Sequence, residues 1–195
     1  MGGDKMNKLK IGFGICGSFC TFHRIFPILQ QLKEAGYDIY PIMSKAAFTT
    51  DTRFGKSAEI NQKIEEICGR EIISTLSAAE PIGPKKMLDI MAVAPCTGNT
   101  LGKLSCGITD TPVTLAVKAH LRNSRPVVIA VSTNDALAAS AQNIGRLLNN
   151  RNIFFVPMKE DDPQNKPTSL VADFSRVAEA IERAQYGQQL HPLFA

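Results

Sequence analysis

Apolar runs typical of buried strands alternate along this chain with stretches whose apolar residues recur at helical spacing. The strand patterns cover residues 9–16, 37–43, 90–94, 126–131 and 153–156, and the helical patterns cover residues 22–35, 60–67, 111–122, 136–148 and 171–184. Alternating strands and helices are connected by right-handed crossovers, which produce a mostly parallel sheet with helices on both faces. We therefore predict an α/β fold, a Rossmann-like or flavodoxin-like three-layer sandwich.

Glycines and prolines mark where several of these elements begin, bend or continue. Gly12 and Gly14 interrupt the first apolar run without ending it, so we expect both within the strand. Pro27 predicts a kink or a separate first turn in the helix that follows. Thr111-Pro112 combines a capping residue with proline at the first helical position, which predicts a helix start.

The length of 195 residues is enough to bury the core of one compact domain, so we assign residues 1–195 to a single domain. We expect residues 1–7 to be disordered and residues 159–195 to form a C-terminal loop, helix and tail. No apolar stretch is long enough to cross a membrane, and residues 1–10 lack the apolar core of a signal peptide. These features predict a cytoplasmic protein with no membrane partner.

The net charge of +4 comes from Lys and Arg residues that are scattered along the chain, and aromatic residues are few. A nucleic-acid binder would show a basic stripe, so we expect no nucleic-acid partner and favour an anionic small molecule. The five cysteines are an odd number and form no C-x-x-C pair, which argues against disulfides and against a metal site. We expect reduced thiols.

Four short segments rich in glycine, hydroxyl and amide groups follow predicted strands. Ligands of parallel α/β sheets bind beyond the carboxyl ends of the strands, so these segments are the candidate cofactor-binding site. The candidate residues are Gly17, Ser18, Phe19 and Cys20 after the first strand, Ser44 and Ala46 after the second, Pro95, Cys96, Thr97, Gly98, Asn99 and Thr100 after the third, and Ser132, Thr133 and Asn134 after the fourth.

The first of these segments completes the literal pattern G-x-G-x-x-G at residues 12–17, which is typical of dinucleotide-binding sites. That fingerprint requires a full strand before its first glycine, whereas here the apolar run continues through Gly12 and Gly14. The second strand also ends in Ser44-Lys45, where an NAD site would usually have Asp or Glu. Because an NADP site could have lysine there, dinucleotide binding remains a rival interpretation.

A phosphate cradle for a mononucleotide is the alternative interpretation of the same segment. Gly17, Ser18 and the backbone N–H groups that follow would bind the phosphate at the start of the first helix, and the Ser44 hydroxyl would contribute from the next segment. A purely structural explanation is also available, in which Gly17 permits the turn and Ser18 caps the helix.

Residues 94–110 form the most distinctive segment, because small residues, a proline and several hydroxyl or amide groups directly follow a buried strand. This segment resembles the P-x-S-A-N-T-x-x-K-x-x-x-G-I-x-D signature of the flavoprotein family that contains cysteine decarboxylases and flavin prenyltransferases. The matching residues are Asn99, Thr100, Lys103, Gly107, Ile108 and Asp110. The resemblance extends over residues 8–157. It implies FMN, with its ring and ribityl chain against this segment and its phosphate on the first one.

Two departures from the family pattern argue against decarboxylation of peptidyl cysteine. Family decarboxylases have an active-site histidine where this chain has Pro81, and we expect His23, His120 and His191 on helix surfaces or in the tail. The decarboxylases also have P-A-M-N after the fifth strand, whereas this chain has Ser132-Thr133-Asn134-Asp135.

Residues 11–21 and 95–100 are similar to one branch of the family in particular. Members of this branch are the B subunits of a two-component dehydrogenase from spore-forming bacteria. The resemblance implies an A subunit that binds NADP, a small dicarboxylate substrate of the dihydropyridine type, and its oxidation to pyridine-2,6-dicarboxylate in the mother cell during sporulation. It also implies a homo-oligomer.

Aromatisation of such a substrate requires a hydride acceptor, a base and cations for two carboxylates. Lys85, Lys86 and Lys103 approach the mouth of the expected cleft in sequence, and Arg53 or Lys56 could reach it from the segment after the second strand. Any one of these side chains could equally be a solvated surface group.

Three further residues have both a functional and a structural explanation. Cys20 and Cys96 lie near predicted helix starts, where the pKa of a thiol tends to fall, but each could also serve as a small packing residue. Asp110 could orient a ligand or cap the helix that Pro112 opens. Three hypotheses follow for the chain: one component of the two-component dehydrogenase, an independent FMN-dependent decarboxylase or flavin prenyltransferase, and a scaffold subunit without cofactor.

Overall fold

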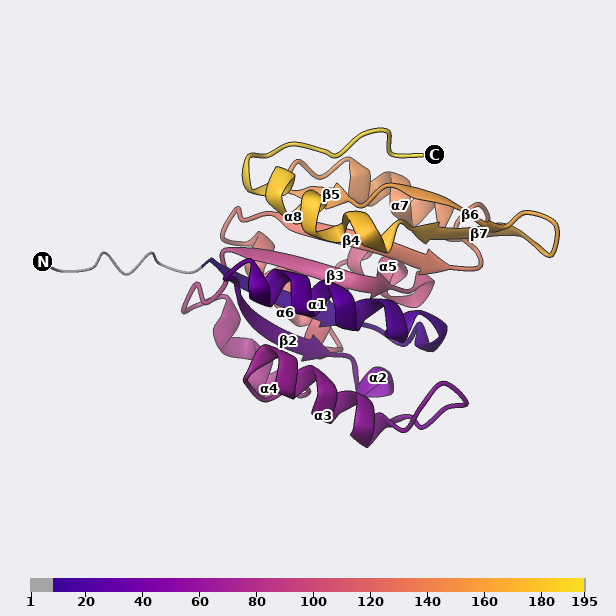
Figure 1. Cartoon of the computed structure of the whole chain (residues 1–195). Helices are drawn as coiled ribbons and strands as arrows, with labels where there is room; N and C mark the ends of the chain where they lie inside the picture. The colour runs from indigo at the N-terminus through magenta and orange to yellow at the C-terminus, as the bar shows by residue number, and fades with distance from the viewer. Residues whose placement is uncertain (1–8, 195) are drawn as a thin grey trace, which may run out of the picture.

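The computed structural model describes residues 9–194, which form one sheet between two layers of helices (Figure 1). Its strands are β1 (Lys10–Ile15), β2 (Asp38–Met43), β3 (Ile90–Cys96), β4 (Val127–Thr133), β5 (Ile153–Phe155), β6 (Met158–Asp162) and β7 (Lys166–Ala172). The first five are parallel in the order β2-β1-β3-β4-β5. This arrangement confirms the predicted single-domain α/β sandwich.

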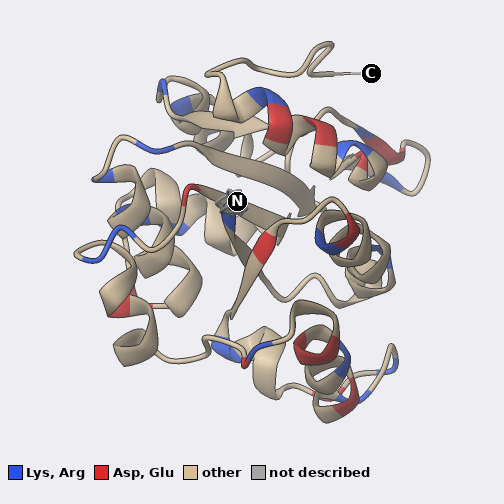
Figure 2. Ribbon diagram, turned by 60° about the vertical axis from the view of Figure 1, so that its left-hand side comes forward, with Lys and Arg blue, Asp and Glu red and all other residues tan. Residues whose placement is uncertain are grey.

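Helices cover both faces of the sheet. They are η1 (Phe19–Arg24), α1 (Ile25–Glu34), α2 (Lys45–Thr49), α3 (Ser57–Cys68), α4 (Leu76–Ala79), η2 (Glu80–Ile82), α5 (Gly98–Ser105), α6 (Pro112–Leu121), α7 (Ala141–Leu148), η3 (Phe174–Arg176) and α8 (Val177–Gln185). Buried side chains of α1, α3 and α8 form a hydrophobic cluster on one face, and those of α5, α6 and α7 form a second cluster on the other. Figure 2 shows most charged residues on helices and loops around parallel strands that carry few charges.

Strand β3 lies at the centre of the molecule, and all of its residues are buried, as is typical of a parallel strand that is covered on both faces. In the neighbouring strand β1, glycines leave room for adjacent side chains. A Cβ on Gly12 would collide with the side chains of Leu88 and Met91. Gly12 and Gly14 therefore lie within the strand, as predicted, and neither forms the turn that a dinucleotide fingerprint requires.

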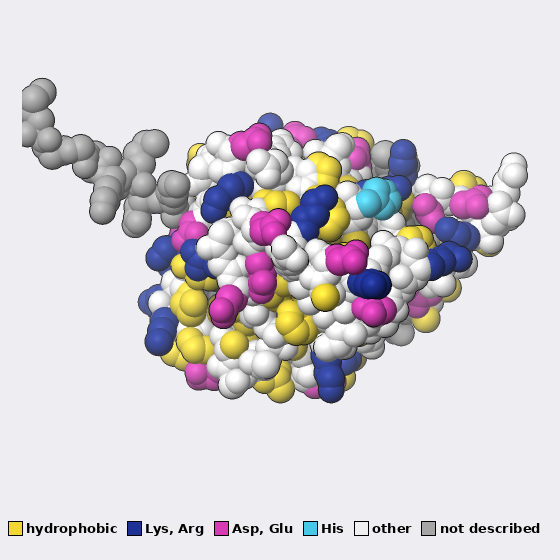
Figure 3. Space-filling model, turned by 60° about the horizontal axis from the view of Figure 1, so that its bottom comes forward, with side chains coloured by type: hydrophobic (Ala, Val, Ile, Leu, Met, Phe, Trp, Pro, Cys, Tyr) yellow, Lys and Arg dark blue, Asp and Glu magenta, His cyan; other side chains and the backbone are white. Residues whose placement is uncertain are grey.

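The C-terminal part of the sheet differs from the prediction. The sequence predicts a loop, a helix from residue 171 and a tail over residues 159–195, but β6 and β7 form an antiparallel hairpin, and the helix α8 begins only at Val177. Residues Leu170 and Val171 of β7 pair with Thr133 and Ser132 at the end of β4. The segment of β7 is a strand because it pairs with β4, which is distant in sequence. Local periodicity does not predict this pairing. Figure 3 shows the hairpin projecting from the body of the molecule.

Two other boundaries concern helix starts. The 3-10 helix η1 precedes α1, which confirms the separate first turn expected near Pro27. The helix expected from residue 136 begins instead at Ala141, because the backbone N–H groups of Ala138 and Ser140 donate to the Asp135 carbonyl and form turns. This turn brings Asp135 to the carboxyl edge of the sheet, where the candidate site lies.

Candidate ligand-binding site

A cavity of about 870 Å³ lies at the carboxyl ends of the parallel strands, and we call it the carboxyl-edge cavity. Ten of the predicted cofactor-binding residues line it: Gly17, Ser18, Phe19, Cys20, Thr97, Gly98, Asn99, Ser132, Thr133 and Asn134. The structure thus brings the segments after β1, β3 and β4 together at one place. The segment after β2 contributes differently, through Arg53 and Phe54 further along the chain.

The first segment turns sharply after β1. The Ser18 N–H donates to the Cys16 carbonyl over 2.8 Å, so this group of the expected phosphate cradle already has a partner. The N–H groups of Phe19 and Cys20 have no hydrogen-bond partner among the described residues. The Ser18 side chain makes no capping bond to η1, and its hydroxyl lies 2.9 Å from the Ser132 hydroxyl. The proposed capping role of Ser18 is therefore wrong, because its hydroxyl bonds to the segment after β4.

Ser44 lies below the cavity surface rather than on it. Its hydroxyl is buried and accepts a hydrogen bond from the Ala47 N–H at 3.3 Å, which caps α2. Ala46 is exposed, and a Cβ on Gly17 would lie 3.9 Å from its Cβ. Neither residue lines the cavity, so the expected contact of the Ser44 hydroxyl with a phosphate is not present in this arrangement.

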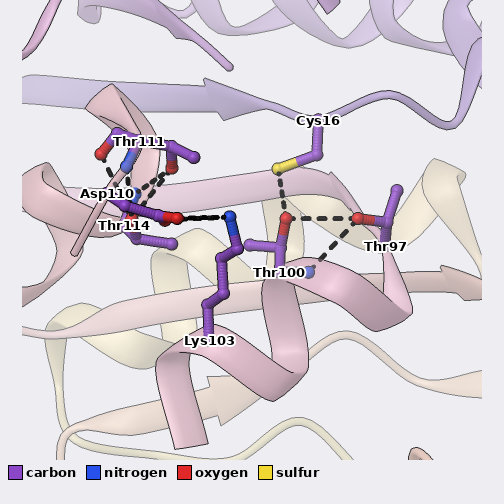
Figure 4. Close-up of polar contacts among 7 residues, drawn as sticks. All are labelled: Cys16, Thr97, Thr100, Lys103, Asp110, Thr111 and Thr114. Carbon is purple, nitrogen blue, oxygen red and sulfur yellow. Dashed lines mark hydrogen bonds and ion pairs between the residues drawn. The ribbon is translucent and has the colours of Figure 1, made fainter. Parts of the chain in front are cut away.

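The third segment forms a polar start to α5 above a buried layer. Thr97 caps α5 by accepting from the Thr100 N–H at 3.4 Å, and the Thr100 hydroxyl donates to the Cys16 sulfur at 3.2 Å (Figure 4). The buried layer beneath Thr97 consists of Cys16, Pro95, Cys96 and Thr100. Thr97 and its neighbours Gly98 and Asn99 therefore face the cavity, while the other predicted residues of the segment support them.

Burial raises the pKa of the two thiols in this layer, Cys16 and Cys96. Desolvation raises the pKa of Cys16 to about 11 and raises the pKa of Cys96 well above its usual value, and the nearby Cys16 raises the latter further. Of the two explanations that the sequence allows for Cys96, small-residue packing therefore fits the structure and a reactive thiol does not. Cys20, in contrast, is exposed and lines the cavity.

The segment after β4 holds a carboxylate in a fixed orientation. Asp135 Oδ1 accepts hydrogen bonds from the Thr133 hydroxyl at 2.5 Å and from the Ser140 hydroxyl at 2.9 Å. Its second oxygen has no hydrogen-bond partner among the described residues, and Asp135 lines the cavity. Gly98 packs against this group so closely that a Cβ there would lie 2.7 Å from Oδ1.

The β6–β7 hairpin forms the part of the cavity wall that sequence reasoning missed. Asp161 and Lys166 form an ion pair with 2.8 Å between Oδ2 and Nζ, and the Ser169 hydroxyl donates to the Thr133 carbonyl at 3.2 Å. Leu170 and Val171 complete this wall. The short apolar run at residues 170–172 is the available signal, but it also fits the pattern of the final helix, which is expected from residue 171.

The three lysines expected near the cleft lie elsewhere. Lys103 forms an ion pair with Asp110 across 2.8 Å beside the start of α6 (Figure 4). Lys85 and Lys86 lie in the segment before β3, where the Lys86 carbonyl accepts from Arg125, which itself precedes β4. This position is the amino edge of the sheet, opposite the cavity. The prediction that Lys85 and Lys86 lie at the mouth of the cavity is therefore wrong. The order of the loops along the sequence does not indicate at which edge of the sheet each loop lies.

Two other sequence interpretations are corrected near α6. Thr111, rather than Asp110, caps this helix and forms a reciprocal pair of hydrogen bonds with Thr114. His120 is buried rather than on the helix surface, and its Nε2 donates to the Pro126 carbonyl at 3.1 Å. Burial lowers the pKa of His120 to about 4, so the ring is neutral near pH 7. His120 therefore has a structural role at the amino edge.

Some features that would indicate other kinds of site are absent from the described part of the chain. None of the described residues that line the cavity is a histidine, and Pro81 lies in η2. Residues 9–194 contain no group of three or more Cys, His, Asp or Glu side chains that could hold a metal ion. The helices of the same residues are too short or too polar to cross a bilayer.

Comparisons with known proteins identify relatives of the chain. The model of the Flavoprotein family matches residues 2–182. The B subunit of dipicolinate synthase from Bacillus subtilis (strain 168) is 46% identical over 191 residues, which cover 96% of this chain and 96% of that protein. The crystal structure of the corresponding protein from Bacillus halodurans has a TM-score of 0.88 at 44% identity and covers 96% of each chain. The FMN-dependent cysteine decarboxylase SpaF shares the fold, with a TM-score of 0.66 at 22% identity over 90% of this chain and 97% of that one.

Proposed function

The chain belongs to the Flavoprotein family, and from this premise we propose that it is the B subunit of a dipicolinate synthase. The observation that carries the proposal is the 46% identity to the Bacillus subtilis protein, which extends over nearly the whole of both chains. A similarity of that extent includes the carboxyl-edge cavity, because the cavity draws on residues 17–171.

In the proposed activity the chain works with the A subunit of dipicolinate synthase, which binds NADP. The pair oxidises a dihydrodipicolinate-type precursor to pyridine-2,6-dicarboxylate in the cytoplasm of the mother cell during sporulation. The substrate loses a hydride to the nicotinamide and a proton to a base, and its ring becomes aromatic. The protein itself must therefore hold two carboxylates and accept one proton.

The carboxyl-edge cavity fits FMN in volume and in polar groups. Its volume of about 870 Å³ lies within the range of small-molecule sites, and its walls combine hydroxyl and amide groups with the rings of Phe19 and Phe54. The unpaired N–H groups of Phe19 and Cys20 suit a phosphate, and the Thr97 and Asn99 side chains suit the ribityl chain and ring. A bound flavin would supply hydride and electron transfer.

We assign the role of proton acceptor to Asp135. Its Oδ1 is held by the Thr133 and Ser140 hydroxyls, while its other oxygen is available in the cavity. The second carboxylate of the cavity, Asp161, is instead paired with Lys166. A fixed carboxylate with one available oxygen can remove the ring proton of a dihydropyridine as the hydride departs.

Two alternatives stand beside this proposal. An independent FMN-dependent decarboxylase or flavin prenyltransferase would act without the A subunit, and a scaffold subunit would bind no cofactor. The absence of a histidine among the described cavity residues disfavours decarboxylation of the family type. We also propose a homo-oligomer, which analytical ultracentrifugation of the purified chain would test.

Co-expression with the A subunit, followed by a dehydrogenase assay on the cyclised precursor, tests the proposed function. We expect NADPH and pyridine-2,6-dicarboxylate to form only when both subunits and NADP are present. Absence of product with both subunits and NADP would overturn the proposal, and turnover by the chain alone would support the independent enzyme. Colourless protein that does not take up added FMN would remove the flavin part and leave the two-component dehydrogenase.

A further inference from the structure

Two arginines on the wall of the carboxyl-edge cavity lack a carboxylate partner among the described residues. Arg24 is the last residue of η1, and Arg53 lies between α2 and α3, so they approach the cavity from different segments. The ion pairs formed by residues 9–194 include neither of them. Both side chains are exposed and therefore available to a ligand.

Aromatic rings position both guanidinium groups. The Arg24 Cζ atom lies 5.9 Å from the centroid of the Phe174 ring, and the Arg53 Cζ atom lies 4.8 Å from the centroid of the Phe54 ring. A guanidinium that stacks on a ring keeps the N–H groups at its edge free, and these donors match the geometry of carboxylate and phosphate oxygens. The stacking therefore presents both arginines to an anion with limited side-chain freedom.

The remaining charges of the cavity leave these arginines uncompensated. Lys166 is the third cation of the wall, and its charge is balanced by Asp161, the partner in its ion pair. Asp135 is the second carboxylate, and it accepts hydrogen bonds from hydroxyl groups rather than from a cation. The three cations and two carboxylates therefore leave an excess of positive charge on the cavity wall, which favours an anionic ligand.

We propose that Arg24 and Arg53 form a binding site for a dianion in this cavity. This inference rests on the proposed function and deepens it, because it identifies the side chains that hold the ligand's charge. Dianionic oxygens could come from the phosphate of FMN or from the two carboxylates of a pyridine-2,6-dicarboxylate. Both sources present the oxygen pairs that a guanidinium binds with two parallel hydrogen bonds.

Calorimetric titration of the purified chain distinguishes the sources. The ligands are FMN, riboflavin, which lacks the phosphate, pyridine-2,6-dicarboxylate, and pyridine-2-carboxylate, which has one carboxylate. The variants are Arg24→Gln, Arg53→Gln and the double variant, with Arg151→Gln as the matched control because Arg151 is exposed and outside the cavity. Thermal unfolding of each variant establishes that it remains folded.

We expect each single substitution to weaken binding of the dianion about tenfold, because each removes charged hydrogen bonds, and the double substitution to weaken it further. Weaker binding of FMN with unchanged binding of riboflavin assigns the site to the phosphate. If the substitutions weaken binding of pyridine-2,6-dicarboxylate more than binding of pyridine-2-carboxylate, the site is assigned to the substrate. Affinity of the wild-type chain should also fall as salt is added, since both cations are exposed.

Equal affinities of the wild-type chain and the folded double variant for FMN and for pyridine-2,6-dicarboxylate would overturn the dianion site. A wild-type chain that binds neither ligand would overturn it as well. These results are separable from the proposed function, which depends on product formation with the A subunit. A double variant that forms product normally and binds both ligands as tightly as the wild-type chain would sink the dianion site alone, whereas an inactive wild-type pair that still binds the dianion through both arginines would sink the dehydrogenase alone.

Discussion

Gly98 packs closely against Asp135 in the wall of the carboxyl-edge cavity, although the two residues follow different strands. A Cβ on Gly98 would lie 2.7 Å from Asp135 Oδ1 and 2.9 Å from the Ser140 hydroxyl that bonds to it. Real Cβ atoms do not approach polar atoms so closely, so any larger residue would displace the carboxylate. The lack of a side chain at Gly98, after β3, thus leaves the space that the Asp135 carboxylate occupies after β4.

Substitution of Gly98 by alanine should move Asp135 from its hydroxyl partners. We expect about a tenfold or greater loss of kcat/KM in the two-component assay, together with about 1–3 kcal/mol of destabilisation from overpacking. Gly102→Ala is the control, because a Cβ there would lie 3.6 Å from the nearest atom, Asn143 Nδ2, and alanine favours a helix interior. Equal activity of both variants would show that the contact has no functional role.

Substitution of Asp135 by asparagine keeps the shape of the side chain and removes its ability to accept a proton at neutral pH. If Asp135 is the base, kcat should fall by about 100-fold or more while KM changes little. Asp161→Asn removes the other carboxylate of the cavity and should cause a much smaller loss, because its charge is already paired with Lys166. Similar losses in both variants would contradict the assignment.

The five thiols should react with a thiol-specific reagent in two groups. Cys20 and Cys106 are exposed and should react rapidly in the folded protein. Burial raises the pKa of Cys16 to about 11 and that of Cys68 to about 12, and it raises the pKa of Cys96 well above its usual value. Only thiolates are nucleophilic, so these three should react only after unfolding.

Absorbance of the released chromophore at mildly alkaline pH measures the number of rapidly reacting thiols. We expect two for the wild-type chain and one for the Cys20→Ser variant. Rapid reaction of three or more thiols in the folded protein would show that at least one of Cys16, Cys68 and Cys96 is open to solvent.

His120 should make the folded protein less stable in acid. Its pKa of about 4 lies below the ordinary value of 6.5, so the unfolded chain takes up the proton first as the pH falls. Stability should therefore decline between about pH 6.5 and pH 4, by up to about 3 kcal/mol from this group. Urea unfolding of wild type and His120→Asn across this range measures the effect.

The decline should be smaller in the His120→Asn variant, whatever its stability at neutral pH. His23→Gln is the control, because it removes a histidine that is exposed on η1. A steeper decline in His120→Asn than in wild type would contradict the structural role of the neutral ring.

Local sequence patterns were sufficient for the parallel part of the fold. The apolar runs around Phe13, Val93 and Ile129 belong to strands that are buried on both faces, so periodicity and composition alone identify them. The same reasoning located the segments after β1, β3 and β4 in the cavity, because the carboxyl ends of parallel strands meet at one edge.

Non-local contacts account for what the sequence could not show. The short apolar run at residues 170–172 is a weak signal of the hairpin, because β7 pairs with the distant end of β4 and β6 exposes mainly polar side chains. The side chain of Arg24 has a helix-surface position in sequence. Only the folded structure places it against Phe174 and in the wall of the carboxyl-edge cavity.

The sequence by itself thus determined the alternation of strands and helices, the α/β sandwich and most of the segments that line the carboxyl-edge cavity. Those features depend on periods of two to four residues, which the chain displays locally. The tertiary structure decided that Lys85 and Lys86 lie opposite the cavity, that Cys96 is buried, and that a hairpin completes the wall. Burial and charge balance arise from residues far apart in sequence, so they exist only once the chain has folded.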